Sequence, residues 1–231
     1  MSPRKKPPEH VPSPELAQYL AEVCKYQDRL AQINAMSRDE AGKIKKAEQL
    51  RLSSLLANVI ASDLRKRGVR DARAGEIAIA GALSRPRVDV SETSLEDGLK
   101  LGIEIKTVNE AAGRAMWNRV GDLRSFAVNY HLKFPYAVCG GVITVPDEMP
   151  GEKNLLSLIR RVERVLARVN GRPDEGSAPH RLEAIAFLVY RCRTPRIELH
   201  PDLPSAESGL RYEPFITALV SAYEARFFPK E

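Results

Sequence analysis

The sequence predicts an α/β fold, and the spacing of its apolar residues carries that prediction. Apolar side chains follow helical spacing in the first part of the chain, and the period changes to alternation near Arg85. Strand and helix patterns then succeed one another to the end of the chain, as in a sheet covered by helices. Hydrophobic residues make up 43% of the 231 residues, which is enough for a substantial core.

The N-terminal part is predicted to be helical after a flexible arm. Residues 1–14 contain five prolines and a basic cluster, so we expect them to form the arm. Ser13-Pro14 is a helix start signal, and Ser37 with Glu40 has the form of a capping box. The second helix should run to about Lys66. We expect residues 15–70 to form a helical region, with a shorter third helix over 72–83.

Residues 71–231 are predicted to form the α/β domain. Two alternating segments joined by Asp97-Gly98 indicate a β-hairpin over 86–108. A helix over 110–132, a buried strand over 136–145 and an amphipathic helix over 155–169 should follow. The last elements expected are a strand over 182–192, a short strand over 196–199 and a helix over 212–227.

Charge and cysteine usage limit the class of protein. The formal net charge is +6 and the sequence pI about 9.3, a balance that suits a polyanionic partner. Cys24, Cys139 and Cys192 are far apart and odd in number, so we expect free thiols, no structural zinc and a reducing cytoplasm. No apolar run approaches the roughly 20 residues of a membrane helix, so no membrane association is expected.

The candidate chemistry lies on the predicted hairpin. Glu104 and Lys106 are two residues apart and share one face of a strand, while Ile103 and Ile105 point the other way into the core. Asp89 lies on the neighbouring strand. Two converging carboxylates suit Mg²⁺, which prefers oxygen ligands and can activate water beside a phosphodiester.

This pattern resembles that of the PD-(D/E)xK nuclease superfamily. The matching segments are Pro86-Arg87-Val88-Asp89 and Ile103-Glu104-Ile105-Lys106. The resemblance implies a restriction-endonuclease-like mixed sheet flanked by helices, with Asp89, Glu104 and Lys106 catalytic. It also implies that Asp89, Glu104 and the Ile105 carbonyl bind the metal, with Glu76 as a further acid from the preceding helix. The alternative is a surface hairpin on which Glu104 and Lys106 form a solvated pair.

Basic residues near the hairpin are candidate phosphate contacts. The predicted set is Arg85, Arg87, Arg114, Arg119, Arg124 and Lys133. Arg160, Arg164 and Arg168 form a further helical stripe, which fits a phosphate-binding surface and a solvated face equally well. Trp117 is expected in the core, and Gly102 is expected to leave room for substrate.

These residues together predict a Mg²⁺-dependent endonuclease acting on double-stranded DNA, similar to type II restriction endonucleases. Cutting both strands of a duplex favours a homodimer, with one site for each strand. Two other functions fit the same residues. One is a repair or recombination nuclease that recognises DNA structure, and the other is a DNA-binding module without catalytic activity.

Overall fold

The computed structural model describes residues 12–192 and 197–228. Helix α1 spans Pro14–Asn34 and helix α2 spans Arg38–Lys66, so both predicted helices are confirmed. Each begins at a serine whose hydroxyl accepts a backbone N–H bond, from Leu16 to Ser13 and from Glu40 to Ser37. These bonds satisfy amides that have no partner inside the helix. Most of the predicted N-terminal arm, residues 1–11, lies outside the described residues.

The sheet has six strands in the order β1-β2-β3-β4-β5-β6. Neighbours pair antiparallel from β1 to β3, parallel from β3 to β5, and antiparallel between β5 and β6. The predicted hairpin and the two buried strands are therefore confirmed. The strands are β1 Arg73–Ala78, β2 Arg87–Ser94, β3 Gly98–Thr107, β4 Val138–Pro146, β5 Ala184–Arg191 and β6 Glu198–Leu199.

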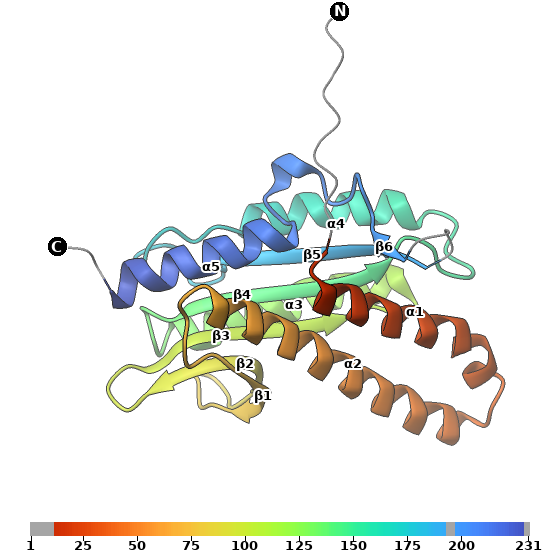
Figure 1. The fold of residues 1–231 in the computed structure, drawn as a ribbon, viewed down its shortest axis with the longest axis horizontal. Coiled ribbons are helices and arrows are strands. Elements are labelled where there is room, and N and C mark those ends of the chain that lie inside the picture. Colours follow the sequence, from red (N-terminus) through yellow and green to blue (C-terminus); the bar gives the residue numbers. More distant parts are fainter. Residues whose placement is uncertain (1–11, 193–196, 229–231) are drawn as a thin grey trace, which may run out of the picture.

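Helices cover both faces of the sheet (Figure 1). Helix α3, Ala112–His131, joins β3 to β4, and helix α4, Leu155–Val169, joins β4 to β5. Right-handed crossovers that add parallel strands in one direction place their helices on the same face. Helices α1, α2 and α5, Tyr212–Phe227, cover the other face, and a short 3-10 turn, Ala206–Ser208, precedes α5. The chain is thus a mixed α/β protein with helices on both sides of one sheet.

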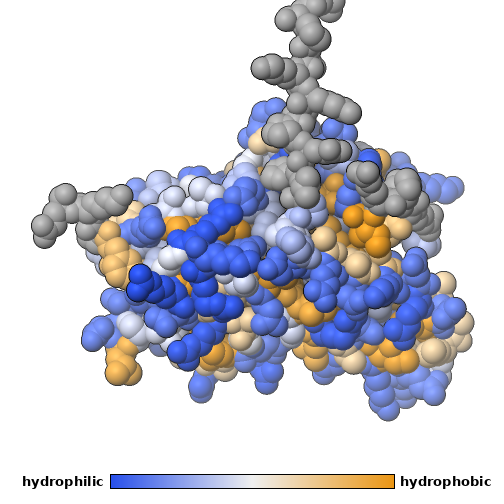
Figure 2. All heavy atoms as spheres, viewed as in Figure 1, coloured by the Kyte–Doolittle hydropathy of each residue, from blue (hydrophilic) through white to orange (hydrophobic). Residues whose placement is uncertain are grey.

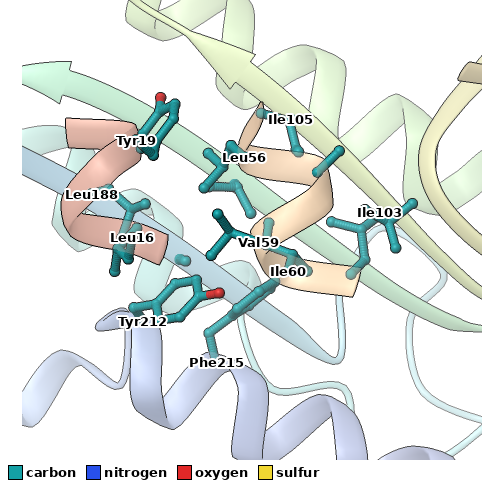
Figure 3. Close-up of a cluster of buried hydrophobic side chains, with 14 of the residues drawn as sticks. Leu16, Tyr19, Leu56, Val59, Ile60, Ile103, Ile105, Leu188, Tyr212 and Phe215 are labelled. Atoms are coloured by element: carbon teal, nitrogen blue, oxygen red, sulfur yellow. The ribbon is translucent and has the colours of Figure 1, made fainter. Parts of the chain in front are cut away.

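The larger core lies between the sheet and the layer of α1, α2 and α5 (Figure 3). Leu56 and Ile60 of α2 are fully buried, as is Ile103 of β3, and Ile105 is 4% exposed. Burial of one such side chain contributes about 1.5–3 kcal/mol to stability. The predicted inward orientation of Ile103 and Ile105 is therefore confirmed, and it fixes which face of β3 carries Glu104 and Lys106.

The predicted third helix over 72–83 is wrong, because Arg73–Ala78 forms edge strand β1. Gly75 has φ +137°, a backbone conformation that interrupts an α-helix and that glycine adopts at low cost. Pairing with β2 outweighs the helix propensity of the alanines, which is a weak preference of less than about 1 kcal/mol per residue. Glu76 consequently comes from a strand and not from a helix.

The expectation that every cysteine is a free thiol is also wrong. Cys24 of α1 and Cys192, next to the end of β5, form a disulfide with a Cα–Cα distance of 5.2 Å. They are 168 residues apart in sequence, so only the packing of α1 against the sheet brings them together. Cys139 is a buried free thiol, as expected. The disulfide removes the sequence argument for a reducing compartment, and a cytoplasmic location stays a prediction.

The surface formed by α1, α2 and α5 is largely hydrophilic (Figure 2). Many of its basic side chains pair with acids, as Arg51 does with Glu22 and Glu48, and Lys66 with Glu15. Such exposed pairs contribute little to stability but balance the local charge. None of the described helices has the length and hydropathy required to cross a bilayer.

Gly141 of β4 allows α3 to pack closely on the sheet. A Cβ there would lie 2.8 Å from Leu123 and 3.0 Å from Leu182. We therefore expect Gly141→Ala to lower the free energy of unfolding by about 1–3 kcal/mol, measured by urea denaturation. A Cβ at Gly42 of α2 would meet no atom within 4 Å, so Gly42→Ala should stabilise the protein by up to about 1 kcal/mol. Equal effects of the two substitutions would contradict this packing argument.

Candidate active site

Asp89 and Glu104 come from adjacent strands at the point where their pairing stops. The β2–β3 ladder ends at the pair Val90–Ile103, and one further residue in the same register would set Asp89 opposite Glu104. In place of a further ladder bond, Asp89 Oδ2 accepts the Ile105 N–H at 2.6 Å. The N–H and C=O of a strand residue point to the same side. The Ile105 carbonyl therefore also faces the strand that carries Asp89.

Strand β2 is irregular at Asp89. A regular strand places residues i and i+2 on one face. Val88, however, packs with Phe126 and Tyr130 of α3, whereas Val90 packs in the core on the α2 side. The change of face between the two valines lets the intervening Asp89 side chain reach the backbone of β3.

Glu104 and Lys106 are on the face of β3 that α3 covers, opposite the core face of Ile103 and Ile105. They form an ion pair between Glu104 Oε1 and Lys106 Nζ, and their side chains are 12% and 25% exposed. The pair is therefore not the solvated surface pair of the alternative interpretation. Gly102 precedes them on this face, but a Cβ there would meet Leu99 and Phe126. Gly102 makes room for α3, so its predicted role toward substrate is wrong.

Burial dominates the electrostatics of the two carboxylates. It raises the pKa of Glu104 to about 7, although the charge and hydrogen bond of Lys106 oppose the rise. It also raises the pKa of Asp89, against the Ile105 N–H bond and the charge of Lys106. Each carboxylate thus lacks part of the solvation that an anion needs. The two groups are close enough that the negative charge of Asp89 further raises the pKa of Glu104.

A β-bulge in β1 brings Glu76 near Asp89 of the neighbouring strand. The β1–β2 register shifts between Ala74 and Ile77, and bulges of this kind re-aim side chains. The negative charge of Glu76 contributes to the raised pKa of Asp89, which places the two acids near each other. Glu76 itself pairs with Arg87 at 2.8 Å. Glu76 lies on a strand and not on the expected helix. Its role as a metal ligand stays a prediction.

Sequence reasoning missed Asp122 of α3 as a member of this group. Its negative charge acts on Glu104 and raises the pKa of that carboxyl. Asp122 pairs with Arg119 at 2.9 Å, and the buried Nε of Arg119 has no hydrogen-bond partner within the described residues. The one available signal was that Asp122 is the only acid in α3.

The other predicted phosphate contacts are exposed but spread over α3 and its flanks. Arg85 lies in the loop before β2, Arg114 and Arg124 lie on α3, and Lys133 follows α3, where its Nζ is 5.3 Å from the Phe134 ring. Trp117 is 38% exposed, so its predicted place in the core is wrong. Of the whole predicted set, the structure brings only Arg87 and Arg119 into contact with acids near Asp89 and Glu104.

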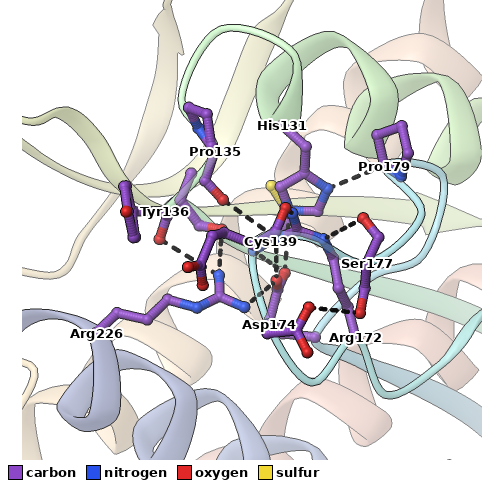
Figure 4. Close-up of polar contacts among 12 residues, drawn as sticks. His131, Pro135, Tyr136, Cys139, Arg172, Asp174, Ser177, Pro179 and Arg226 are labelled. Carbon is purple, nitrogen blue, oxygen red and sulfur yellow. Dashed lines mark hydrogen bonds and ion pairs between the residues drawn. The ribbon is translucent and has the colours of Figure 1, made fainter.

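A second buried cluster contains His131, Cys139, Arg172 and Arg226 (Figure 4). These residues share one acceptor, Glu183, just before β5. His131, Cys139 and Glu183 form the one three-residue group of potential metal ligands in the described ranges. Glu183 already accepts bonds from Arg172 at 3.0 Å, Arg226 at 2.7 Å, His131 and the Cys139 N–H. Two arginines disfavour a further cation, and burial raises the pKa of the Cys139 thiol well above its ordinary value. The cluster fits an internal ion-pair network better than a metal centre.

An open cavity of about 480 Å³ lies at the other end of β3. Its apolar lining includes Leu95, Phe134, Tyr136 and Phe227. It touches β3 at Gly98 and Leu99, and about six residues of extended strand, roughly 20 Å, separate Gly98 from Glu104. This cavity therefore plays no part in the chemistry of Asp89 and Glu104.

Comparisons with protein-family models, curated proteins and solved structures found no match to this chain. The resemblance to the PD-(D/E)xK superfamily rests on the motif residues and stays a prediction.

The Glu183 network predicts a loss of stability in acid. Burial alone would raise the pKa of Glu183, but the His131 hydrogen bond and the His131 and Arg226 charges bring it to about 2, below the ordinary 4.5. Because the folded pKa is lowered, the stabilisation is complete above about pH 4.5 and disappears as pH falls toward 2. Its size is on the order of 3 kcal/mol. Urea denaturation between pH 7 and pH 2.5 measures this loss.

Glu183→Gln is the control for that experiment. It leaves two buried arginines without their carboxylate, so it should destabilise the protein at pH 7 by about 3–5 kcal/mol. It should also flatten the dependence of stability on pH between 4.5 and 2.5. An unchanged acid slope in the variant would show that another carboxylate is responsible.

Proposed function

We propose that the protein is a Mg²⁺-dependent endodeoxyribonuclease with a restriction-endonuclease-like fold. The observation that carries the proposal is the Asp89–Ile105 hydrogen bond next to the Glu104–Lys106 ion pair. It groups two carboxylates, one lysine and one strand carbonyl on adjacent strands. The mixed sheet with a helix after the hairpin is compatible with the fold that the motif implies.

The donor set fits a hard divalent cation. Asp89 and Glu104 supply carboxylate oxygens, and the Ile105 carbonyl faces the same side of β3 as the amide that Asp89 accepts. The raised pKa values of both acids reflect negative charge that burial leaves poorly solvated. A bound Mg²⁺ would supply Lewis-acid activation of a phosphodiester and of water. Asp89, Glu104 and the Ile105 carbonyl are the groups that would hold it.

The remaining residues position substrate and balance charge. Lys106, which contacts Glu104, can orient an attacking water and stabilise negative charge on the phosphate. Arg119 is paired through its Nη1 with Asp122, whose charge acts on Glu104, so this arginine balances negative charge near the carboxylates. Arg87 is paired with Glu76, whose charge acts on Asp89. This division of roles needs no histidine or cysteine nucleophile.

We expect Asp89→Asn, Glu104→Gln and Lys106→Ala each to abolish cleavage of duplex DNA in Mg²⁺. Each change removes a metal ligand or the group beside the attacking water, while DNA binding should persist. Cleavage of phage DNA followed by mapping of the ends measures activity and cut sites together. One fixed set of ends would support the sequence-specific, restriction-type form of the proposal.

Asp97→Asn is the matched control, because Asp97 is an exposed acid at the opposite end of the same hairpin. It caps the turn through Ser94, whose hydroxyl bonds to its carboxylate at 3.0 Å. Its activity should equal that of the unaltered protein. Full activity in Asp89→Asn or Glu104→Gln would refute the site. A protein that binds but never cuts, with or without Mg²⁺, would support the non-catalytic module.

Mg²⁺ should raise the melting temperature of the protein, and more strongly at pH 8 than at pH 6. The pKa of Glu104 is about 7, so its carboxylate is mostly ionised at pH 8 and mostly protonated at pH 6. Protons compete with metal, and the apparent affinity should fall roughly tenfold over this range. Thermal denaturation with increasing Mg²⁺ measures the shift without reference to activity. An equal shift in Glu104→Gln would place the metal elsewhere.

A homodimer stays part of the proposal for duplex cleavage. Sedimentation with and without DNA tests it, and a monomer in both conditions would remove it. A structure-recognising repair or recombination nuclease is the other enzymatic form. It would spare plain duplex and cut branched or flapped DNA.

A further inference from the structure

Helices α3 and α4 form a surface with an excess of positive charge. Together they carry seven arginines and two acids, whereas α1 and α2 carry nine basic and seven acidic residues. Neither acid of α3 and α4 balances the charge of the exposed arginines on these helices. Glu163 is buried and accepts the Ser205 N–H at 2.7 Å, and Asp122 is paired with Arg119.

Most of these arginines have no carboxylate partner in the described part of the chain. The basic residues of α1 and α2 contrast with them, since several pair with acids of the same layer. An ordinary solvated helix face mixes both signs of charge, whereas a one-sided basic face attracts a polyanionic partner. Within residues 12–192 and 197–228, the exposed arginines of α3 and α4 without such a partner include Arg114, Arg124, Arg160, Arg164 and Arg168.

The two helices present one continuous surface. The Arg161 guanidinium lies 6.0 Å from the centre of the Trp117 ring, so α4 and α3 meet at their exposed edges. Arg160, Arg164 and Arg168 are four residues apart, which sets them about 6 Å apart along the helix. Arg114 and Arg124 extend the charge along α3. The opposite flank of α3 carries Asp122, whose charge acts on Glu104, so the surface borders the candidate active site.

We propose that duplex DNA lies across this α3–α4 surface, with its phosphates on Arg114, Arg124, Arg164 and Arg168. The inference rests on the proposed function and adds to it the path of the substrate. It assigns the phosphate contacts to arginines of α3 and α4 that have no acidic partner among the described residues, in place of Arg87 and Arg119, which are paired with acids. Guanidinium groups bind phosphate oxygens in a bidentate manner, and phosphate contacts dominate non-specific affinity for DNA.

Binding of a labelled duplex to the full chain in EDTA, over a range of salt concentrations, tests this path without cleavage. Each lost phosphate contact should reduce the slope of log affinity against log salt by about 0.9. The double variant Arg164→Ala/Arg168→Ala should therefore lose about 1.8 of slope and bind several-fold more weakly at low salt. The control Lys43→Ala/Lys46→Ala removes the same charge from exposed positions on α2, and should keep the original slope.

An unchanged slope in the α4 variant, or equal losses in both variants, would overturn the proposed path. Binding of the protein to phosphatidylserine vesicles with no binding to duplex would also overturn it, in favour of a membrane surface. Failure of the nuclease proposal has a different signature. In that case the duplex still binds through α4, and no cleavage follows when Mg²⁺ is added.

Discussion

The candidate active site depends on the hydrogen bond from the Ile105 amide to the Asp89 carboxylate. It takes the place of a ladder bond where β2 and β3 cease to pair, so the backbone and the functional group are satisfied together. A hydrogen bond to a charged acceptor contributes about 1.5–3 kcal/mol, enough to hold Asp89 in one position. The pairing of Glu104 with Lys106 follows from the same local geometry, since Ile103 and Ile105 fix the opposite face of β3 in the core.

Two buried polar centres serve different purposes in this fold. Around Glu183, four donors from separate segments satisfy one carboxylate, and the pKa of that group is lowered. At Glu104, Lys106 is the one cationic partner among the described residues, and the pKa is raised to about 7. A carboxylate with its charge fully balanced stabilises the fold. One that remains poorly compensated is available for a cation or a proton.

Asp89, Glu104 and Lys106 were predictable because hairpins encode their geometry locally. Alternation along β3 sets Glu104 and Lys106 on one face, and the Asp97-Gly98 turn brings β2 alongside. Glu76 was predicted on a helix, because the alanine-rich segment around it matches a helical pattern. In the folded protein this segment is strand β1, which pairs with the edge of β2. For Asp122 the sequence offered only one weak signal, its being the only acid of α3, because its place beside Glu104 depends on how α3 packs over the sheet.

The sequence alone determined the helices with strong caps, the hairpin, the buried parallel strands and the face on which the candidate catalytic residues lie. These features depend on neighbours within a few residues, where spacing and turn chemistry act directly. The tertiary structure decided the edge strand β1, the Cys24–Cys192 disulfide, the Glu183 network and the joining of the α3 and α4 arginines in one surface. Each of these depends on contacts between separate elements, which the spacing of residues within one element does not encode.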